Sequence, residues 1–312
     1  MSEVLSGMES ITPPHPAPGG GPASPAQAVR SLSPGRRAWQ RLVRSRSTRA
    51  AMFLLVLLVA LCTLGPLLSP YSQSQQDLDL KASGPSAAHW LGTDPLGRDL
   101  ATRVLVGGQI SLLVGILATA AASVIGVGYG LVAGLAGRRV DAAMMRLVDI
   151  LYAFPFITFV IIRVVLFGRE FWLIFVAIGA VEWLTMARVV RGQVLALKNL
   201  EFVQAARASG AGFWHILLRH MLPNVMGPVI IYASLTVPGV MLLEATLSFL
   251  GLGIQPPDAS WGVLIREGAD SMETHPWMLI GPGVFFSATL LALNILGDAL
   301  RDALDPKSVS AD

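Results

Sequence analysis

The strongest constraint in this sequence is a set of six long apolar segments. A helix needs roughly 20 apolar residues to cross a bilayer core about 30 Å thick. The segments cover approximately residues 50–68, 111–135, 147–167, 171–187, 228–251 and 278–300. Hydrophobic residues make up 53% of the chain and charged residues only 14%, well below the roughly 25% charged residues of soluble domains. The sequence therefore predicts an all-α membrane protein with six transmembrane helices.

The Lys and Arg residues predict which ends of these helices face the cytoplasm, because positive charge is retained on the inner side of a membrane. With the N-terminus inside, the inner segments hold seventeen of the 23 Lys and Arg residues, the outer connections hold five, and Arg163 lies within the third segment. We therefore expect both termini in the cytoplasm, together with the connection between the fourth and fifth segments. The excess of Lys and Arg over Asp and Glu is then explained by the orientation of the protein in the membrane. No nucleic-acid partner is needed to explain it.

The segments outside the apolar runs differ in character. Residues 1–35 contain seven prolines and three consecutive glycines, so they bury too little apolar surface to offset the entropy of ordering, and we expect a disordered cytoplasmic tail. Residues 36–49 are basic with one apolar face, which predicts a short helix on the membrane surface. Residues 69–110 are expected to form an ordered extracytoplasmic cap. Residues 111–300 then form the permease domain, and residues 301–312 a cytoplasmic C-terminus.

The first apolar segment is expected to be an uncleaved helix. A basic region precedes it, as in a signal peptide, but that region is far longer than a signal peptide requires and five further apolar segments follow. We therefore assign residues 50–68 to the first transmembrane helix.

Residues able to support catalysis or cofactor binding are few. The sequence has no GxxxxGK[ST] loop, the device that cradles the phosphates of ATP. Gly126, Gly130 and Gly134 lie within an apolar segment, where small residues at every fourth position let two helices approach closely. His215 and His220 would lie about 140° apart on an α-helix, which makes a poor metal clamp. We therefore expect no catalytic residue, no metal and no cofactor on this chain.

The polar stretch of residues 201–224 predicts a helical hairpin. On a helix that begins at Glu201, four residues share one face and form a strip of mostly small side chains: Phe202, Ala205, Ala206 and Ser209. Gly210 and Gly212 permit a sharp turn, and Pro223 is expected to end the second helix. That helix is expected to pack on the membrane domain through Trp214, Leu217, Leu218 and Met221. Spacing alone leaves open an ordinary cytoplasmic hairpin without a partner.

This stretch resembles the EAA motif of the membrane subunits of binding-protein-dependent ABC importers, written E-A-A-x3-G-x9-I-x-L-P. The corresponding positions are Gln204, Ala205, Ala206, Gly210, His220, Leu222 and Pro223. Gln204 stands in place of the usual Glu and His220 in place of the usual Ile, and Glu201, one turn earlier, is a candidate for the missing carboxylate. In that family the motif forms coupling helices that dock into a cleft on the ATPase subunit. The resemblance therefore implies an ATPase-coupling loop.

The wider resemblance runs from about residue 89 to 307. The segments that carry it are HWLGTDPLGRD, MARVVRGQVLALKNLEFVQAA, LEATLSFLGLG and GDALRDALDPK, which look like the C-type permease subunit of oligopeptide and dipeptide importers. This resemblance implies a type I ABC importer permease fold in the bacterial inner (plasma) membrane. The implied partners are a second, homologous permease subunit, two ATPase subunits that carry ATP and Mg, an extracytoplasmic peptide-binding protein and membrane lipid, with peptide as the substrate.

Other functions remain open at this point. Permeases of the same architecture carry nickel chelates or other small solutes. A stand-alone secondary transporter or channel would transport without an ATPase partner. A membrane-bound scaffold or signalling subunit would dock partners without uptake.

The outer segment HWLGTDPLGRDLATRVLVGG predicts a Pro turn followed by a short helix. Asp94 and Arg98 are able to pair across one turn, and Asp99 follows them directly. We expect these residues to form either a fixed outer cap or part of an outer gate that meets the binding protein.

Three charged residues are expected within the membrane, where each costs about 2.5 to 3.5 kcal/mol on insertion scales. They are Arg163, Glu182 and Glu244. Arg163 pairs with one of the carboxylates, or Glu182 or Glu244 faces the peptide path and meets the amino terminus of a peptide, or the charges have no role in binding substrate. Bends that serve a conformational change are expected at Pro155 and at Pro238.

Overall fold

The computed structural model describes residues 39–40, 42–168, 170 and 172–304. The expected disordered tail (residues 1–35) and residues 305–312 of the expected cytoplasmic C-terminus lie outside the described residues. Among the described ones, Trp39, Gln40 and residues 42–44 are helical, as expected for the short basic helix.

The regular secondary structure of the described residues is helical, apart from a single β-bridge between Thr93 and Asp99. The long helices are α2 (Arg46–Leu68), α3 (Leu100–Leu135), α6 (Leu173–Leu197), α9 (Leu222–Phe249) and α11 (Trp277–Leu304). The shorter elements are η1 (Leu78–Leu80), α4 (Arg138–Tyr152), α5 (Phe156–Phe167), α7 (Glu201–Ala208), α8 (Phe213–His215), η2 (Ile216–Met221) and α10 (Trp261–Asp270). Within the described residues, five helices are long and apolar enough to cross a membrane, or six if a bent pair counts as one span. The expected all-α membrane fold is confirmed.

The third expected span corresponds to two helices. Helices α4 and α5 are long and apolar enough to cross a membrane only when taken together, and they are bent by 77° at the break between them. Pro155 lies at the break as the N-cap of α5, where its ring and missing N–H prevent the helix from continuing. The predicted bend at Pro155 is confirmed. Pro238 lies inside α9, and the predicted bend there stays a prediction.

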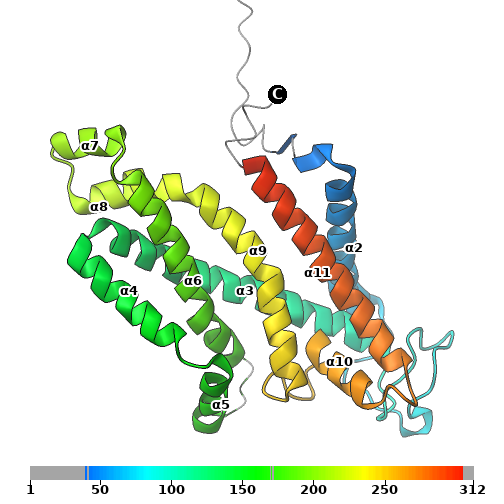
Figure 1. The fold of residues 1–312 in the computed structure, drawn as a ribbon. Coiled ribbons are helices and arrows are strands. Elements are labelled where there is room, and N and C mark those ends of the chain that lie inside the picture. The colour runs from blue at the N-terminus through cyan, green and yellow to red at the C-terminus, as the bar shows by residue number, and fades with distance from the viewer. Residues whose placement is uncertain (1–38, 41, 169, 171, 305–312) are drawn as a thin grey trace, which may run out of the picture.

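Helix α3 begins at Leu100, eleven residues before the expected start of the second span at residue 111. The carboxylate of Asp99 accepts a hydrogen bond from the N–H of Thr102, which caps the helix and extends it into the outer connection. With 36 residues, α3 is about 54 Å long and exceeds the thickness of a bilayer core. It crosses the other long helices obliquely (Figure 1).

The predicted glycine stripe forms the contact between α3 and α6. A Cβ atom at Gly130 would lie 2.6 Å from the carbonyl oxygen of Ala187, and one at Gly134 would lie 2.7 Å from the Cβ of Val194. No side chain fits at such distances, so glycine at these positions lets the two backbones approach. The predicted small-residue packing is confirmed.

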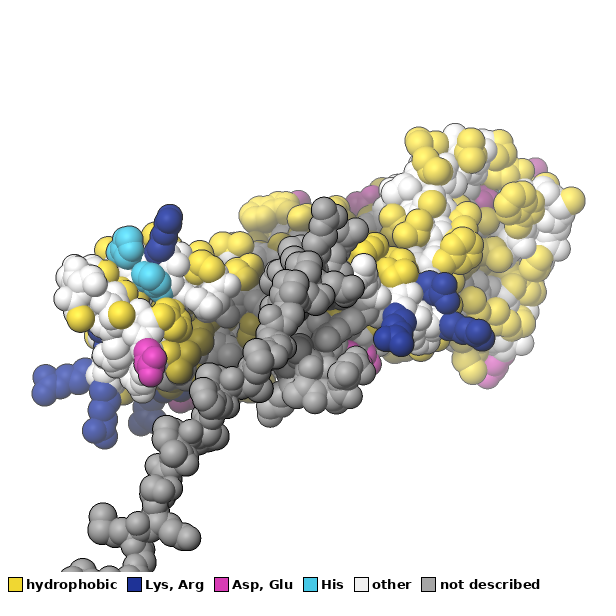
Figure 2. All heavy atoms as spheres, turned by 90° about the horizontal axis from the view of Figure 1, so that it is seen from above, with side chains coloured by type: hydrophobic (Ala, Val, Ile, Leu, Met, Phe, Trp, Pro, Cys, Tyr) yellow, Lys and Arg dark blue, Asp and Glu magenta, His cyan; other side chains and the backbone are white. Residues whose placement is uncertain are grey.

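The two ends of the molecule carry different elements. Helix α7, the beginning of α2 and the end of α11 lie at one end, and α5, α10 and the long connection before α3 lie at the other (Figure 1). Viewed from the α7 end, Lys and Arg side chains show on both sides of the face (Figure 2). The hairpin and the outer cap are thus at opposite ends, as the topology requires. Which end faces the cytoplasm stays a prediction.

Candidate functional site

Helix α7 presents its strip of small residues on the surface. Val203 is buried in a core cluster with Ile216 and Met221, whereas Ala205 is exposed and Ala206 half-buried. The helix ends at Ala208, and Gly210 follows with a φ of +81°, in the left-handed region that glycine adopts without strain. The residues of the predicted strip are thus exposed or half-buried, and the buried Val203 holds the other side of α7 on the membrane domain. Docking of a partner on this strip stays a prediction.

The second arm differs from the expectation. Pro223 does not end it, because α8, η2 and α9 form one helical run from Phe213 to Phe249. Residues 216–221 are π-helical, and Pro223 follows one residue after this turn without breaking the helical run. The expectation for Pro223 is therefore wrong, and Leu222 and Pro223 are the first two residues of α9.

The π-helical turn also changes which side chains face inward. Leu217 and Met221 are buried, as expected, whereas Trp214 is 65% exposed and Leu218 56% exposed. A π-helical turn holds more residues than an α-helical turn, so it rotates later residues relative to earlier ones. Two of the four expected packing residues therefore lie on the surface at the hairpin.

His215 and His220 lie close together, with ring centroids 5.6 Å apart. The expectation that they diverge is wrong for the same reason, since a spacing of five nearly completes one π-helical turn. Histidine side chains show side by side at the end where α7 and α8 lie (Figure 2). Among the described residues, no group of three or more His, Cys, Asp or Glu is arranged to hold a metal ion.

The outer connection contains a buried ionic cluster. The Nε of Arg98 lies 2.6 Å from Oδ2 of Asp94, so the predicted pair is confirmed. The residues between them form a turn closed by the bridge between Thr93 and Asp99, and the expected short helix is instead the start of α3. Asp99 caps α3 and also lies 2.8 Å from Nδ1 of His89.

Two members of this cluster were missed by sequence reasoning. Arg103 is fully buried, and its Nη1 donates to Oδ2 of Asp94 at 2.7 Å and to Oε2 of Glu267 at 2.6 Å. Glu267 lies in α10, 164 positions further along the chain, and no spacing pattern links residues so far apart. The cluster ties the outer connection, α3 and α10 together.

Replacing Arg103 by leucine should loosen this cap. Asp94 would keep a single cationic partner in a buried site, and removing one member of a buried ionic group costs about 3 to 5 kcal/mol. We expect a clear fall in the thermal unfolding midpoint of the purified protein in detergent. Arg188→Leu is the control, because the Arg188 and Asp149 pair is exposed and exposed pairs contribute about 0 to 1 kcal/mol. Equal midpoints for the two variants would contradict the proposed role of Arg103.

The intramembrane charges have different surroundings. Glu244 is fully buried and accepts hydrogen bonds from Ser248 at 2.6 Å and from Ser111 at 3.3 Å. It therefore joins α9 to α3. Arg163 is 7% exposed and donates to the carbonyl of Gly168, and its Nε and Nη2 have no hydrogen-bond partner among the described residues.

Arg163 forms no ion pair with Glu182 or Glu244 in the part of the chain that the structure describes. The alternative that paired them is wrong for this conformation. Glu182 is half-buried in α6. A contact of Glu182 or Glu244 with substrate stays a prediction.

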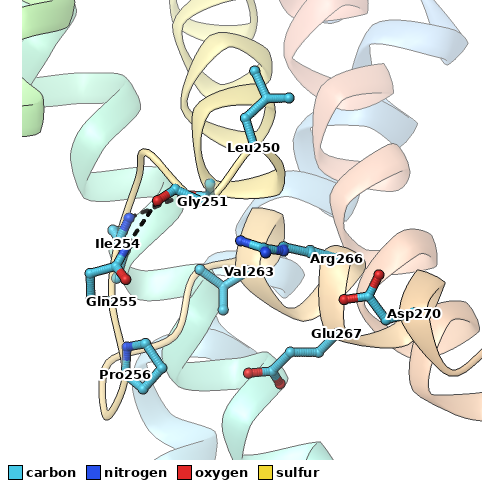
Figure 3. A pocket seen from close by; sticks show the side chains of 10 residues that line it. Leu250, Gly251, Ile254, Gln255, Pro256, Val263, Arg266, Glu267 and Asp270 are labelled. Carbon is cyan, nitrogen blue, oxygen red and sulfur yellow. Dashed lines mark hydrogen bonds between the residues drawn. The ribbon is translucent and has the colours of Figure 1, made fainter. Parts of the chain in front are cut away.

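A cavity of about 520 Å³ lies between the end of α9 and α10. Arg266, Glu267 and Asp270 of α10 lie on one side of it, and Gln255 and Pro256 of the connecting loop on the other (Figure 3). Ser248, which donates to the buried Glu244, also lines it. Helix α10 and the loop after α9, whose residues line the cavity, lie at the end of the molecule opposite α7 (Figure 1).

Comparison with known proteins identifies the fold family. Residues 126–309 match the family described as binding-protein-dependent transport system inner membrane component. The chain belongs to this family. In addition, residues 33–85 match the N-terminal transmembrane domain of oligopeptide transport permease C. This permease is thus a multi-pass inner membrane component of an ABC importer, and as such it needs partner subunits, with ATP hydrolysis on separate subunits.

Several relatives are similar along nearly their whole length. The oligopeptide transport system permease protein OppC of Haemophilus influenzae is 47% identical over 88% of this permease and 90% of the relative. OppC of Escherichia coli K12 is 49% identical over 88% and 92%. The dipeptide transport system permease protein DppC of Bacillus subtilis is 46% identical over 89% and 87%.

Proposed function

We propose that the chain is the C-type permease subunit of an ATP-driven importer for oligopeptides or dipeptides that an extracytoplasmic binding protein delivers. The names of relatives at 46 to 49% identity support a peptide substrate. A glutathione transport system permease protein, GsiD of Pectobacterium atrosepticum, is 40% identical. Transport of nickel chelates or another small solute is the alternative, and these relatives favour peptides over it.

We assign the proposed partners to the two ends of the molecule. The exposed strip on α7, with Glu201, Gln204, Ala205 and Ala206, and the turn at Gly210 form the docking surface for an ATPase subunit that binds ATP and Mg. The basic end that carries α7 and both described chain ends is cytoplasmic. A second, homologous permease subunit completes the path, and the binding protein approaches from the end with α10.

One observation carries the coupling mechanism. A single helical run of 37 residues connects Phe213, in the second arm of the hairpin, with Phe249 near the cavity. Met221 at its base packs in the same cluster as Val203 of α7. Closure of the ATPase pair displaces α7, this packing passes the displacement to α9, and the far end of α9 moves against α10. ATP bound to the ATPase subunits thereby drives a conformational change in this subunit, which does not itself bind ATP.

Reconstitution tests the proposed function. The permease, co-expressed with the proposed second permease subunit and ATPase subunits, is placed in proteoliposomes with the proposed binding protein, and uptake of radiolabelled tripeptide and of nickel is measured. We expect peptide uptake that needs ATP and the binding protein. ATP-driven uptake of nickel without peptide uptake would support the alternative solute, and uptake without an ATPase would support a stand-alone transporter.

A further inference from the structure

Two of the charged side chains that line the cavity between α9 and α10 form no ion pair among the described residues. Glu267 is already held by the buried Arg103. Arg266 and Asp270, in contrast, take part in none of the ion pairs within 4.0 Å in the described part of the chain. Both are exposed and both line the cavity. The cavity thus offers one free positive and one free negative group.

The surroundings orient the guanidinium of Arg266. A Cβ atom at Gly251 would lie 2.5 Å from its Nη1, so the guanidinium rests against the main chain where α9 ends, and a larger residue at Gly251 would displace it. Its side chain extends from α10 toward that end of α9 (Figure 3). A guanidinium held beside a cavity presents a planar pair of N–H donors that matches a carboxylate.

The size of the cavity fits a short peptide. Arg266 and Asp270 begin four residues apart on α10, which is about 6 Å along the helix axis, and the guanidinium of Arg266 then extends toward the end of α9 (Figure 3). The volume of about 520 Å³ lies in the range of about 300 to 1,000 Å³ that is typical of small-molecule sites.

We propose that this cavity binds short zwitterionic peptides, with Arg266 holding the carboxylate end and Asp270 the ammonium end. This proposal rests on the proposed function and deepens it, because it places a substrate contact on this subunit. Ser248 joins the cavity wall to the buried Glu244 on α9, so movement of α9 against α10 changes the shape of the site. Peptide bound between the two helices is then released when ATP drives that movement.

The test measures peptide binding to the assembled permease and ATPase complex in lipid nanodiscs, without the binding protein, which has preferences of its own. The probes are dialanine, N-acetyl-dialanine and dialanine amide. We expect the unmodified complex to bind free dialanine roughly tenfold more tightly than either blocked form, since a charge-assisted hydrogen bond is lost in each. Asp270→Asn should remove only the preference for the free amino end, and Arg266→Gln only the preference for the free carboxyl end.

Glu273→Gln is the matched control, because Glu273 is an exposed carboxylate three residues beyond Asp270 that does not line the cavity; both preferences should remain. The proposal is overturned if the unmodified complex binds the three probes equally, or if Asp270→Asn and Arg266→Gln keep both preferences while the complex stays assembled on size-exclusion chromatography. A separate measurement distinguishes failure of the proposed site from failure of the proposed function. It is ATP-driven uptake of dialanine by the unmodified complex with its binding protein. Uptake of dialanine without these end preferences in binding would support the proposed function and contradict the proposed site. Absence of uptake of any peptide would contradict the proposed function.

Discussion

Gly130→Leu should abolish the folded permease. A Cβ atom at this position would lie 2.6 Å from the carbonyl oxygen of Ala187 and 2.8 Å from the Cβ of Val190, so leucine would force α3 away from α6 along their main contact. Overpacking of this kind costs about 3 kcal/mol or more when backbone atoms are the obstacle. Association of membrane helices depends on close packing. We expect little detergent-extractable protein in the monodisperse fraction of size-exclusion chromatography.

Gly128→Leu is the matched control for this prediction. Gly128 lies on the same helix two residues earlier, is exposed, and has no atom within 4 Å of a Cβ built on it. The substitution adds the same side chain to the same helix without a collision, so the yield of monodisperse protein should match that of the unmodified permease. Equal yields for Gly130→Leu and Gly128→Leu would show that the glycine stripe does not set the distance between α3 and α6.

Ala205→Trp should uncouple the permease from its ATPase. Ala205 is exposed on α7, so the substitution leaves the core intact but fills the strip where we propose that the ATPase docks. Truncating or blocking a central interface residue typically costs about 2 to 4 kcal/mol, equivalent to a loss of about 30- to 1,000-fold in affinity. We expect the ATPase subunits to be lost on co-purification and ATP-dependent peptide uptake to fall to background.

The control for the docking surface is Arg207→Trp. Arg207 is exposed and lies about 200° around the helix from Ala205, away from the proposed strip. Its tryptophan variant should retain the ATPase subunits and most of the uptake. If Ala205→Trp co-purifies with the ATPase and transports like the unmodified permease, this face of α7 is not the docking surface.

Much of the fold was predictable because its signals are local. Hydropathy locates the spans, a glycine at every fourth position marks one helix face, and Pro155, which lacks an N–H, lies at the break between α4 and α5. The exposed strip on α7 follows likewise from helical periodicity, and Gly210, just past the end of that helix, adopts a left-handed conformation. Each of these features depends on residues within a few turns of one another.

The second arm of the hairpin shows where local reasoning failed. A π-helical turn over Ile216–Met221 carries the helix through Pro223 and brings His215 beside His220. The burial of Leu217 and Met221 in the core shared with Val203 accompanies this turn. Helix type within a continuous run is decided by packing, and residue spacing alone does not report it.

The sequence by itself determined most of the spans, the glycine contact, the break at Pro155 and the position of the exposed strip on α7 that we propose docks the ATPase. Only the tertiary structure decided that Arg103 joins Asp94 to Glu267, that Glu244 is held by serines rather than by Arg163, and that Arg266 and Asp270 share a cavity. The reason is physical. Hydropathy and helical periodicity act between neighbours in the chain, whereas a buried charge finds its partner by proximity in space, and α3, α9 and α10 meet only after the helices have packed.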